Sequence, residues 1–198
     1  MSTVLSTRTA GPVRVGDRTP EGRAARRRAL YHLAAPVAVL TVSHEGRVHG
    51  TTVSSVPFLS REPLLLGACL RADSEFADLA ARAGRYTVNV LTAEQGDTAR
   101  HFADSGRPPG LEQFADLAWT PDPYAHAPLL DDALAQYTCR FSGTSRIGDR
   151  SLLIGHVTHA AVGQGDPLIS YAGGLFAGSL DPARDPGPVH RTRKETAA

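Results

Sequence analysis

The amino-acid sequence predicts a mainly β fold: one barrel of six or seven strands with about three helices at its margins. The apolar runs are short and bounded by turn residues, as strands are. Helical patterns do not alternate regularly with these runs, as a doubly wound parallel sheet would require. No GxGxxG motif follows a strand, which argues against a Rossmann dinucleotide site. A length of 198 residues suits a single domain with a sizeable core.

The first predicted helix covers about residues 19–34. Thr19 followed by Pro20 is typical of an N-cap with proline at the first helical position. The side chains expected to face inward are Ala29, Leu30 and Leu33. After Pro36 the apolar run VAVLTV predicts a buried strand, and residues 44–47 form a hairpin turn that leads into the next segment.

Residues 49–66, HGTTVSSVPFLSREPLLL, form the stretch around which the chain is organised. The first half is small and polar, and the apolar run after Pro63 predicts a buried strand. Thr and Ser hydroxyls beside Gly50 allow a backbone to approach a ligand closely, as in phosphate-binding loops. Taken alone, the stretch is explained more simply as a half-exposed strand with a Thr and Ser face.

Two further helices are predicted from their caps. Ser74 begins a short helix that ends at Gly84. Its apolar face consists of Phe76, Leu79, Ala80 and Ala83. Thr92 and Gln95 form a capping box for a helix that reaches Phe102 and Ala103.

The remaining strands are predicted at residues 85–91, at about 135–145 and 151–162, and from Pro167 onward. The intervening segment, 104–126, is rich in proline and predicts a loop.

The charged residues are distributed unevenly, although the formal net charge is only +1. Residues 1–28 hold seven arginines, whereas residues 29–180 hold ten basic and fifteen acidic side chains. This layout argues against a basic nucleic-acid-binding face on the body of the protein. We expect residues 1–22 to be a disordered basic arm, 23–180 to be the domain and 181–198 to be a flexible tail.

Membrane insertion and disulfide bonding are not expected. No apolar run approaches the roughly 18 residues of a spanning helix, and the N-terminal segment lacks the apolar core of a secretory signal. The two cysteines, Cys69 and Cys139, lie in apolar surroundings and are expected to be reduced thiols. These observations favour a cytoplasmic protein.

The stretch 49–66 resembles the core signature of the flavin reductase-like, FMN-binding split-barrel family. In that signature a His-Gly pair leads into Thr-small-Ser-Ser, then a Ser and a Pro that starts a buried strand. The matching positions are His49, Gly50, Thr52, Ser54, Ser55, Ser60 and Pro63. Five further segments match in the same order: RRALYHLAAPVAVLTV, GRYTVNVL with the HFA triplet, PLLDDALAQYTC, GDRSLLIGHV and PLISYAGGL. The resemblance covers about residues 26–180 and implies a Greek-key split β-barrel.

The resemblance also implies the cofactors. FMN, or FAD in some members, would lie along the stretch, and NADH or NADPH would donate a hydride to the flavin. Residues 51–55 would meet the phosphate and ribityl chain, with Ser74 at the phosphate. Phe58, Leu59 and Ser60 would border the isoalloxazine. The complete set of expected cofactor-binding residues is Gly50, Thr51, Thr52, Val53, Ser54, Ser55, Phe58, Leu59, Ser60, Ser74, Phe102 and Arg150.

Several positions depart from the family pattern: Ala35 and Pro36 stand where it usually has Thr-Gly, Phe58 where it usually has Ser, Leu64 where it usually has a second Pro, and Leu175 where it usually has an aromatic residue. Glu75 and Arg150 are the two further departures. Many relatives have Lys or Arg where this chain has Glu75, which would place a negative charge near the expected phosphate. His is common where this chain has Arg150, and Arg150 would reach either the nicotinamide or a dinucleotide phosphate. No side chain is required as a catalytic acid or base, because the protein supplies orientation for the hydride transfer. The histidines show no metal-ligand spacing, so no metal is predicted.

The expected activity is that of an NAD(P)H-dependent flavin reductase whose reduced FMN diffuses to a separate monooxygenase. We also expect a homodimer with the flavin near the subunit boundary, because the apolar strands exceed what the short helices can cover. The alternatives are a flavin-dependent oxidase or monooxygenase acting directly on an organic substrate, and a non-catalytic flavin- or haem-binding barrel. These possibilities differ in flavin retention and in whether NADH is consumed without added substrate.

Overall fold

The computed structural model describes residues 19–177. The predicted tail, 181–198, and most of the predicted arm lie outside this range. The predicted boundary at residue 22 falls inside the first helix, which already begins at Pro20.

The main element of the fold is a seven-stranded antiparallel sheet with the order β3-β2-β6-β9-β10-β5-β4. Its strands are β2 (Ala38–His44), β3 (Arg47–Val53), β4 (Phe58–Arg61), β5 (Leu64–Arg71), β6 (Arg85–Val90), β9 (Ala135–Ile147) and β10 (Arg150–Val162). Two small sheets accompany it: β1 (Ala35–Pro36) with β11 (Ile169–Tyr171) and β12 (Gly174–Phe176), and β7 (Trp119–Pro121) with β8 (Pro128–Leu130).

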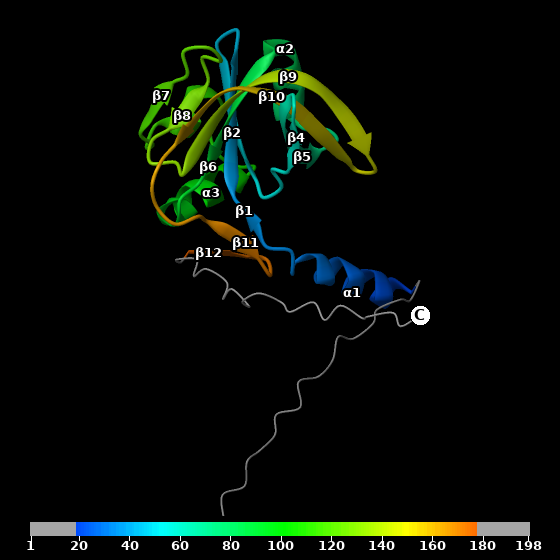
Figure 1. Cartoon of the computed structure of the whole chain (residues 1–198). Coiled ribbons are helices and arrows are strands. Elements are labelled where there is room, and N and C mark those ends of the chain that lie inside the picture. The colour runs from blue at the N-terminus through cyan, green and yellow to red at the C-terminus, as the bar shows by residue number, and fades with distance from the viewer. Residues whose placement is uncertain (1–18, 178–198) are drawn as a thin grey trace, which may run out of the picture.

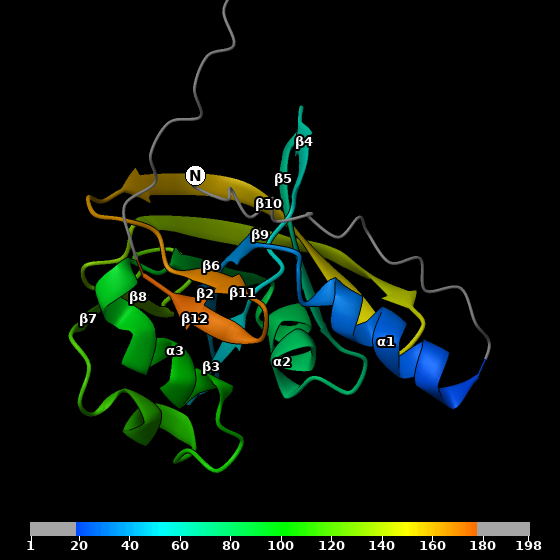
Figure 2. The same ribbon diagram turned by 90° about the horizontal axis from the view of Figure 1, so that it is seen from below.

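The helices are α1 (Pro20–Leu30), α2 (Glu75–Ala83) and α3 (Gly96–Ala103), with short 3-10 helices η1 (Ala93–Gln95) and η2 (Gly110–Phe114). The mainly β prediction is therefore confirmed. The sheet curls around α2 (Figures 1 and 2), but its hydrogen bonding leaves β3 and β4 as edges and does not close a barrel. Beyond β4, the loop after β3 continues along β5, where Cys69 N–H donates to the Ser55 carbonyl and Gly67 N–H to the Pro57 carbonyl.

The core consists of two clusters on opposite faces of β2, because successive side chains of a strand point to opposite sides. The inner cluster joins β2 to α2 and includes Ala38, Leu40, Val42, Phe76 and Leu79. The outer cluster joins the other face to α3 and η2 and includes Val37, Val39, Ala99, Phe102 and Phe114. Burial on both faces explains the unbroken apolar run VAVLTV, and the predicted buried strand is confirmed.

The predicted turns and caps around the central strands are confirmed. Glu45 and Gly46 both have positive φ, 48° and 76°, the conformation of a tight two-residue hairpin turn between β2 and β3. The Ser74 hydroxyl accepts the Ala77 N–H at the start of α2, and Gly84 ends that helix at φ 71°. The Thr92–Gln95 capping box is present, although it caps η1, which then leads into α3.

The first helix differs from its prediction. Thr19 caps it as expected, but it ends at Leu30, and its apolar side chains are not inward: Ala29, Leu30 and Leu33 are exposed, Leu30 to 65% and Leu33 to 69%. The reason is its position beside the body (Figure 1), where its C-terminal end is joined to the β11–β12 turn by a hydrogen bond from Ala172 N–H to the Tyr31 carbonyl.

Smaller differences concern irregular segments. The predicted loop 104–126 contains η2 and β7. The strand predicted from Pro167 begins at Ile169 as β11, after an isolated bridge between Pro167 and Thr92, and a further strand, β12, follows it. Both cysteines are unpaired thiols, as expected. Within residues 19–177, the helices are too short or too polar to span a bilayer.

Candidate flavin-binding site

A polar pocket of about 300 Å³ lies where β3 leaves the sheet, and we call it the hydroxyl pocket. Its lining comes from the end of β3 and the following loop, from β5, from the start of α2 and from the start of β10. The lining residues are Thr51, Thr52, Val53, Ser54, Ser55, Cys69, Leu70, Arg71, Ser74 and Arg150. The structure thus brings together seven of the twelve residues expected from the sequence: Thr51, Thr52, Val53, Ser54, Ser55, Ser74 and Arg150.

The hydroxyl groups in this pocket are not equivalent. The Thr52 hydroxyl donates to the Ala99 carbonyl at 2.8 Å, and the Ser55 hydroxyl donates to the Cys69 carbonyl at 3.3 Å. Within the described range, no hydrogen-bond partner is assigned to the hydroxyls of Thr51 and Ser54. These two hydroxyls are therefore the available donors for a ligand.

Two arginines stand beside these hydroxyls, paired across β5 and β10. Arg71 forms a bidentate ion pair with Asp73, with N–O distances of 3.0 and 2.9 Å, and its hydrogen bond lowers the pKa of Asp73. Arg150 lies 4.0 Å from the Asp149 carboxylate, at the limit of an ion pair, and its side chain is half exposed. Its forked donors are thus available to an anion such as a phosphate.

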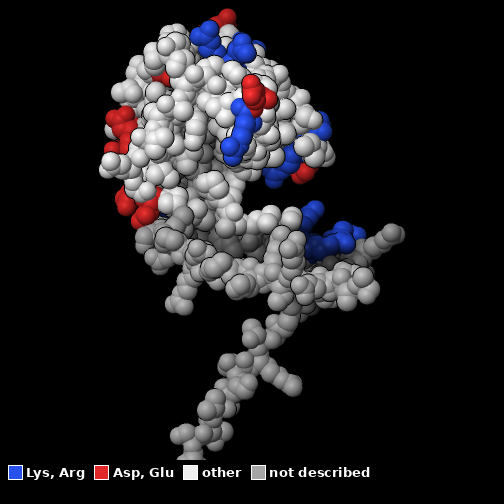
Figure 3. Space-filling model, in the orientation of Figure 1, with Lys and Arg blue, Asp and Glu red and all other residues white. Residues whose placement is uncertain are grey.

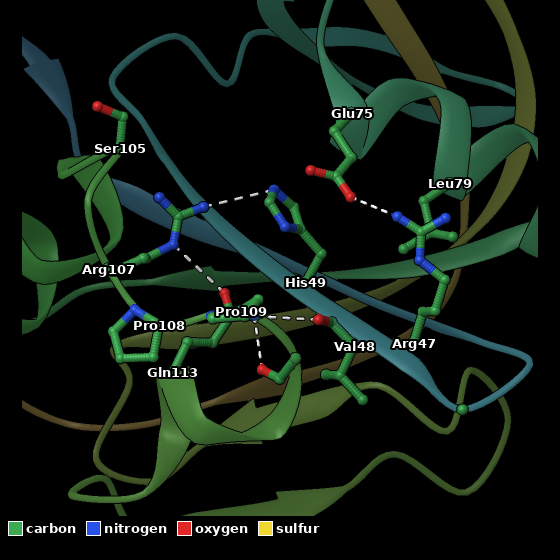
Figure 4. Close-up of a pocket in the computed structure, with 12 residues that line it drawn as sticks. Arg47, Val48, His49, Glu75, Leu79, Ser105, Arg107, Pro108, Pro109 and Gln113 are labelled. Carbon is green, nitrogen blue, oxygen red and sulfur yellow. Dashed lines mark hydrogen bonds and ion pairs between the residues drawn. The ribbon is translucent and has the colours of Figure 1, made fainter.

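The Glu75 carboxylate does not enter the hydroxyl pocket, contrary to the concern raised by the sequence. It pairs with the Arg47 guanidinium at 2.5 Å and lines a different pocket, in which Figure 4 shows it turned toward Arg47. The negative charge at this position is consequently compensated by Arg47, and the first turn of α2 faces the hydroxyl pocket with Ser74.

A larger, mainly apolar pocket of about 640 Å³ adjoins the hydroxyl pocket. It lies between the C-terminal end of α1, β1, the β11–β12 hairpin and the loop after β3, and Figure 3 shows the surface hollowed between α1 and the body. Its residues are Leu30, Tyr31, Leu33, Ala34, Ala35, Pro36, Ser54, Ser55, Val56, Pro57, Cys69, Ser170, Gly173, Gly174 and Leu175. Ser54, Ser55 and Cys69 line both pockets, so a polar chain and an aromatic ring system can occupy them together.

Five expected site residues lie elsewhere. Gly50 is buried against α3, where an added Cβ would lie 2.5 Å from the Phe102 ring, and Phe102 itself is 1% exposed in the outer cluster. Phe58, Leu59 and Ser60 form most of β4 and are absent from the lining of both pockets. Their assignment to the flavin stays a prediction from the resemblance.

Three residues of the hydroxyl pocket, all on β5, were not among the expected cofactor-binding residues: Cys69, Leu70 and Arg71. A signal for two of them existed in the sequence, since Cys69 and Arg71 are two positions apart on one strand and therefore share a face.

The residues present fit a flavin mononucleotide. Unassigned hydroxyls, a helix N-terminus and an available guanidinium suit a phosphate and a polyol chain, while the apolar lining suits an aromatic ring system. Among residues 19–177, no group of three or more His, Cys, Asp or Glu side chains could hold a metal ion.

Comparisons with known proteins agree with this chemistry. The family model described as "Flavin reductase like domain" matches residues 30–179. The chain is 37% identical over 154 residues to an NADPH-flavin oxidoreductase of Streptomyces viridifaciens, covering 75% of this chain and 79% of that protein. It is 31% identical to the reductase component of a 4-nitrophenol 4-monooxygenase/4-nitrocatechol 2-monooxygenase of Rhodococcus opacus, covering 82% and 84%.

Solved structures give the same result for the fold. An NADH:FAD oxidoreductase of Streptomyces globisporus superposes with a TM-score of 0.76 at 28% identity, covering 85% of this chain and 99% of that chain. The flavin reductase component of a bacterial two-component tryptophan halogenase superposes with a TM-score of 0.73 at 27% identity, covering 78% and 96%. The chain therefore belongs to the flavin reductase-like family.

Proposed function

We propose that this protein is an NAD(P)H-dependent flavin reductase that reduces FMN and releases the reduced flavin to a separate monooxygenase. The observation that carries the proposal is the junction of the hydroxyl pocket and the apolar pocket at Ser54, Ser55 and Cys69. A phosphate and ribityl chain fit the first pocket and a ring system fits the second. FAD remains an alternative flavin, and either NADH or NADPH is the donor.

The protein's own residues contribute binding and orientation. The flavin, when bound, supplies the two-electron acceptor. The Thr51 and Ser54 hydroxyls donate hydrogen bonds to the phosphate or ribityl chain, and Arg150 balances the phosphate charge. Neighbouring Arg71 is already neutralised by Asp73 and contributes less. The position of Arg150 beside Ser74 favours the phosphate over the nicotinamide as its ligand.

The apolar pocket has the second task, which is to hold the flavin ring and the nicotinamide against each other. Hydride transfer requires reacting atoms at about 3–3.5 Å, and an apolar wall that excludes water helps to maintain this geometry. Leu30, Tyr31 and Leu33 of the α1 end and Leu175 of β12 form the wall opposite the loop after β3. Because a hydride carries both electrons to the flavin, the transfer itself needs no proton donor from the protein.

The test is to purify the protein, add free FMN and follow nicotinamide absorbance with NADH and with NADPH. A reductase oxidises the nicotinamide steadily without any organic substrate, at a rate that saturates with FMN. A flavin-dependent oxidase or monooxygenase would retain its flavin and require an organic substrate, and a binding protein would oxidise neither nicotinamide. Absence of turnover with both FMN and FAD would contradict the proposal.

We also propose a homodimer, supported by apolar side chains at the sheet edge and on α1. Phe58 and Leu59 are exposed on the edge strand β4 and Leu64 on its neighbour β5. Leu30 at the end of α1 and Leu33 just after it are also exposed. Light scattering is expected to give twice the chain mass of 21.0 kDa, and the monomer mass at micromolar concentration would contradict the dimer.

A cytoplasmic location, supported by the two unpaired thiols, and the absence of nucleic-acid or membrane partners complete the proposal.

A further inference from the structure

An ion pair between Arg71 and Asp73 lies at the border of the hydroxyl pocket. Arg71 is the last residue of β5 and lines the pocket, whereas Asp73, two residues later, does not belong to the lining. The Asp73 carboxylate accepts two hydrogen bonds from the guanidinium, from Nε at 3.0 Å and from Nη2 at 2.9 Å. Asp73 thus contacts the pocket only through Arg71.

The position of Arg71 favours an anion in the pocket. Arg71 is paired directly with Arg150 across β5 and β10, and both arginines line the pocket together with Ser74, the cap of α2. Two like charges at paired positions of neighbouring strands repel each other. A phosphate beside both guanidinium groups would relieve this repulsion. Asp73 already relieves part of it by pairing with Arg71.

The two arginines differ in how firmly an acidic side chain holds them. Asp73 binds Arg71 through two hydrogen bonds, whereas the Asp149 carboxylate lies 4.0 Å from Arg150, at the limit of an ion pair. Arg71 lowers the pKa of Asp73 by its hydrogen bond, and the charge of Arg146 adds a smaller contribution. Asp73 is therefore ionised at neutral pH and cancels the charge of Arg71.

The Arg71–Asp73 pair can nevertheless open. The side chains of Arg71 and Asp73 are 76% and 71% exposed, so that separating them buries neither charge. Exposed ion pairs are weak because water screens both charges. A flavin phosphate, which carries about 1.5 to 2 negative charges, can consequently take the Arg71 guanidinium from Asp73, but it must compete with the carboxylate to do so.

This competition suits a flavin that is a substrate and has to leave after reduction. On the basis of the proposed function, we propose that Asp73 is a positioning residue that weakens the binding of the flavin phosphate by holding Arg71, so that the reduced flavin is released and not retained. Arg150 then supplies the phosphate contact that persists, and Arg71 supplies one that Asp73 limits.

The test compares FMN with riboflavin, which has no phosphate, in fluorescence titrations of the full chain. Asp73→Asn should bind FMN about two- to fivefold more tightly, the range of an exposed ion pair, and should bind riboflavin as the wild type does. Asp73→Glu keeps the charge and should resemble the wild type. The matched control is Asp78→Asn, an exposed carboxylate of α2 outside the pocket lining, which should leave both affinities unchanged.

Two further measurements separate an electrostatic effect from a structural one. In the background Arg71→Gln, Asp73→Asn should have little effect, because Asp73 acts through Arg71. The gain in FMN affinity should also shrink in 1 M salt, where charges are screened within about 3 Å. In steady-state kinetics Asp73→Asn should lower the KM for FMN. The rate of hydride transfer in a single turnover should stay unchanged, because Asp73 does not line the apolar pocket.

Failure of the proposed function would give a different result, since the wild type would then turn over neither FMN nor FAD. With turnover intact, three results would each overturn the role of Asp73. They are FMN affinity in Asp73→Asn that is equal to or weaker than that of the wild type, an equal gain for riboflavin, and an undiminished gain in the Arg71→Gln background. Weaker FMN binding would mean that Asp73 directs Arg71 toward the phosphate.

Discussion

Replacing Gly50 by alanine separates a structural role of this glycine from a role in binding the flavin. The added Cβ would lie 2.5 and 2.7 Å from two ring carbons of Phe102 and 3.2 Å from the Phe114 ring. Both rings are 1% exposed and pack in the outer cluster, so they cannot move aside freely. Overpacking of this kind costs about 1–3 kcal/mol of unfolding free energy.

Urea unfolding measures this cost directly. With a urea slope of about 2 kcal/mol per molar, a loss of about 2 kcal/mol lowers the midpoint by about 1 M. The matched control is Gly96→Ala at the start of α3, where the Cβ would meet only the Arg100 side chain at 3.6 Å. That change should be neutral or slightly stabilising, because alanine restricts the unfolded chain more than glycine. An unchanged midpoint in Gly50→Ala, together with weakened FMN binding, would refute the packing argument and restore the cofactor role.

Three further predictions concern the hydroxyl pocket and the titration of His49. Arg150→Ala should weaken the binding of FMN by about three- to tenfold, the loss of a charged hydrogen bond reduced by solvent exposure. Its affinity for riboflavin, which has no phosphate, should be unchanged. An equal loss of riboflavin affinity in fluorescence titrations would exclude a contact between Arg150 and the phosphate. The double variant Thr51→Val, Ser54→Ala should weaken FMN about tenfold or more, whereas Thr52→Val, whose hydroxyl bonds to Ala99, should mainly reduce stability. Burial lowers the pKa of His49 in the folded state below the ordinary histidine pKa of 6.5. As the pH drops through 6.5, the unfolded state therefore binds a proton at His49 before the folded state does, and the free energy of unfolding should fall. The wild type should therefore lose more stability between neutral and mildly acid pH than His49→Gln; identical pH profiles of the urea midpoint would contradict this.

Local signals were sufficient to predict most of the fold. The Ser74 cap, the Gly84 terminus, the His44–Arg47 turn and the two long strands β9 and β10 each depend on residues adjacent in the chain. Whether the apolar side chains of α1 are buried depends on which surface lies opposite the helix, and no local sequence pattern specifies that surface. For this reason the sequence predicted an inward apolar face where Leu30 and Leu33 are exposed.

The candidate site shows the same division. Residues 51–55 could be selected because four of these five adjacent residues carry a hydroxyl, and Ser74 because it is a helix cap. The family pattern suggested that Glu75 would lie near the phosphate, but its direction depends on Arg47, which is distant in sequence and adjacent in space. The hydrogen bonds of Arg107 could not be predicted either, because its acceptors come from β3, η2 and the loop after α3.

The two-residue turn between β2 and β3 makes this hairpin intolerant of changes in length. It fixes a register in which Gly50 is paired with Thr41 and faces the Phe102 and Phe114 rings. One extra residue accommodated within β3 would move every following side chain to the opposite face and bring the His49 imidazole against those rings. The β9–β10 turn is less constrained by packing, because Gly148 has φ 61° with no atoms near an added Cβ and the neighbouring side chains are exposed; there the limit on added length is the position of Arg150 in the hydroxyl pocket.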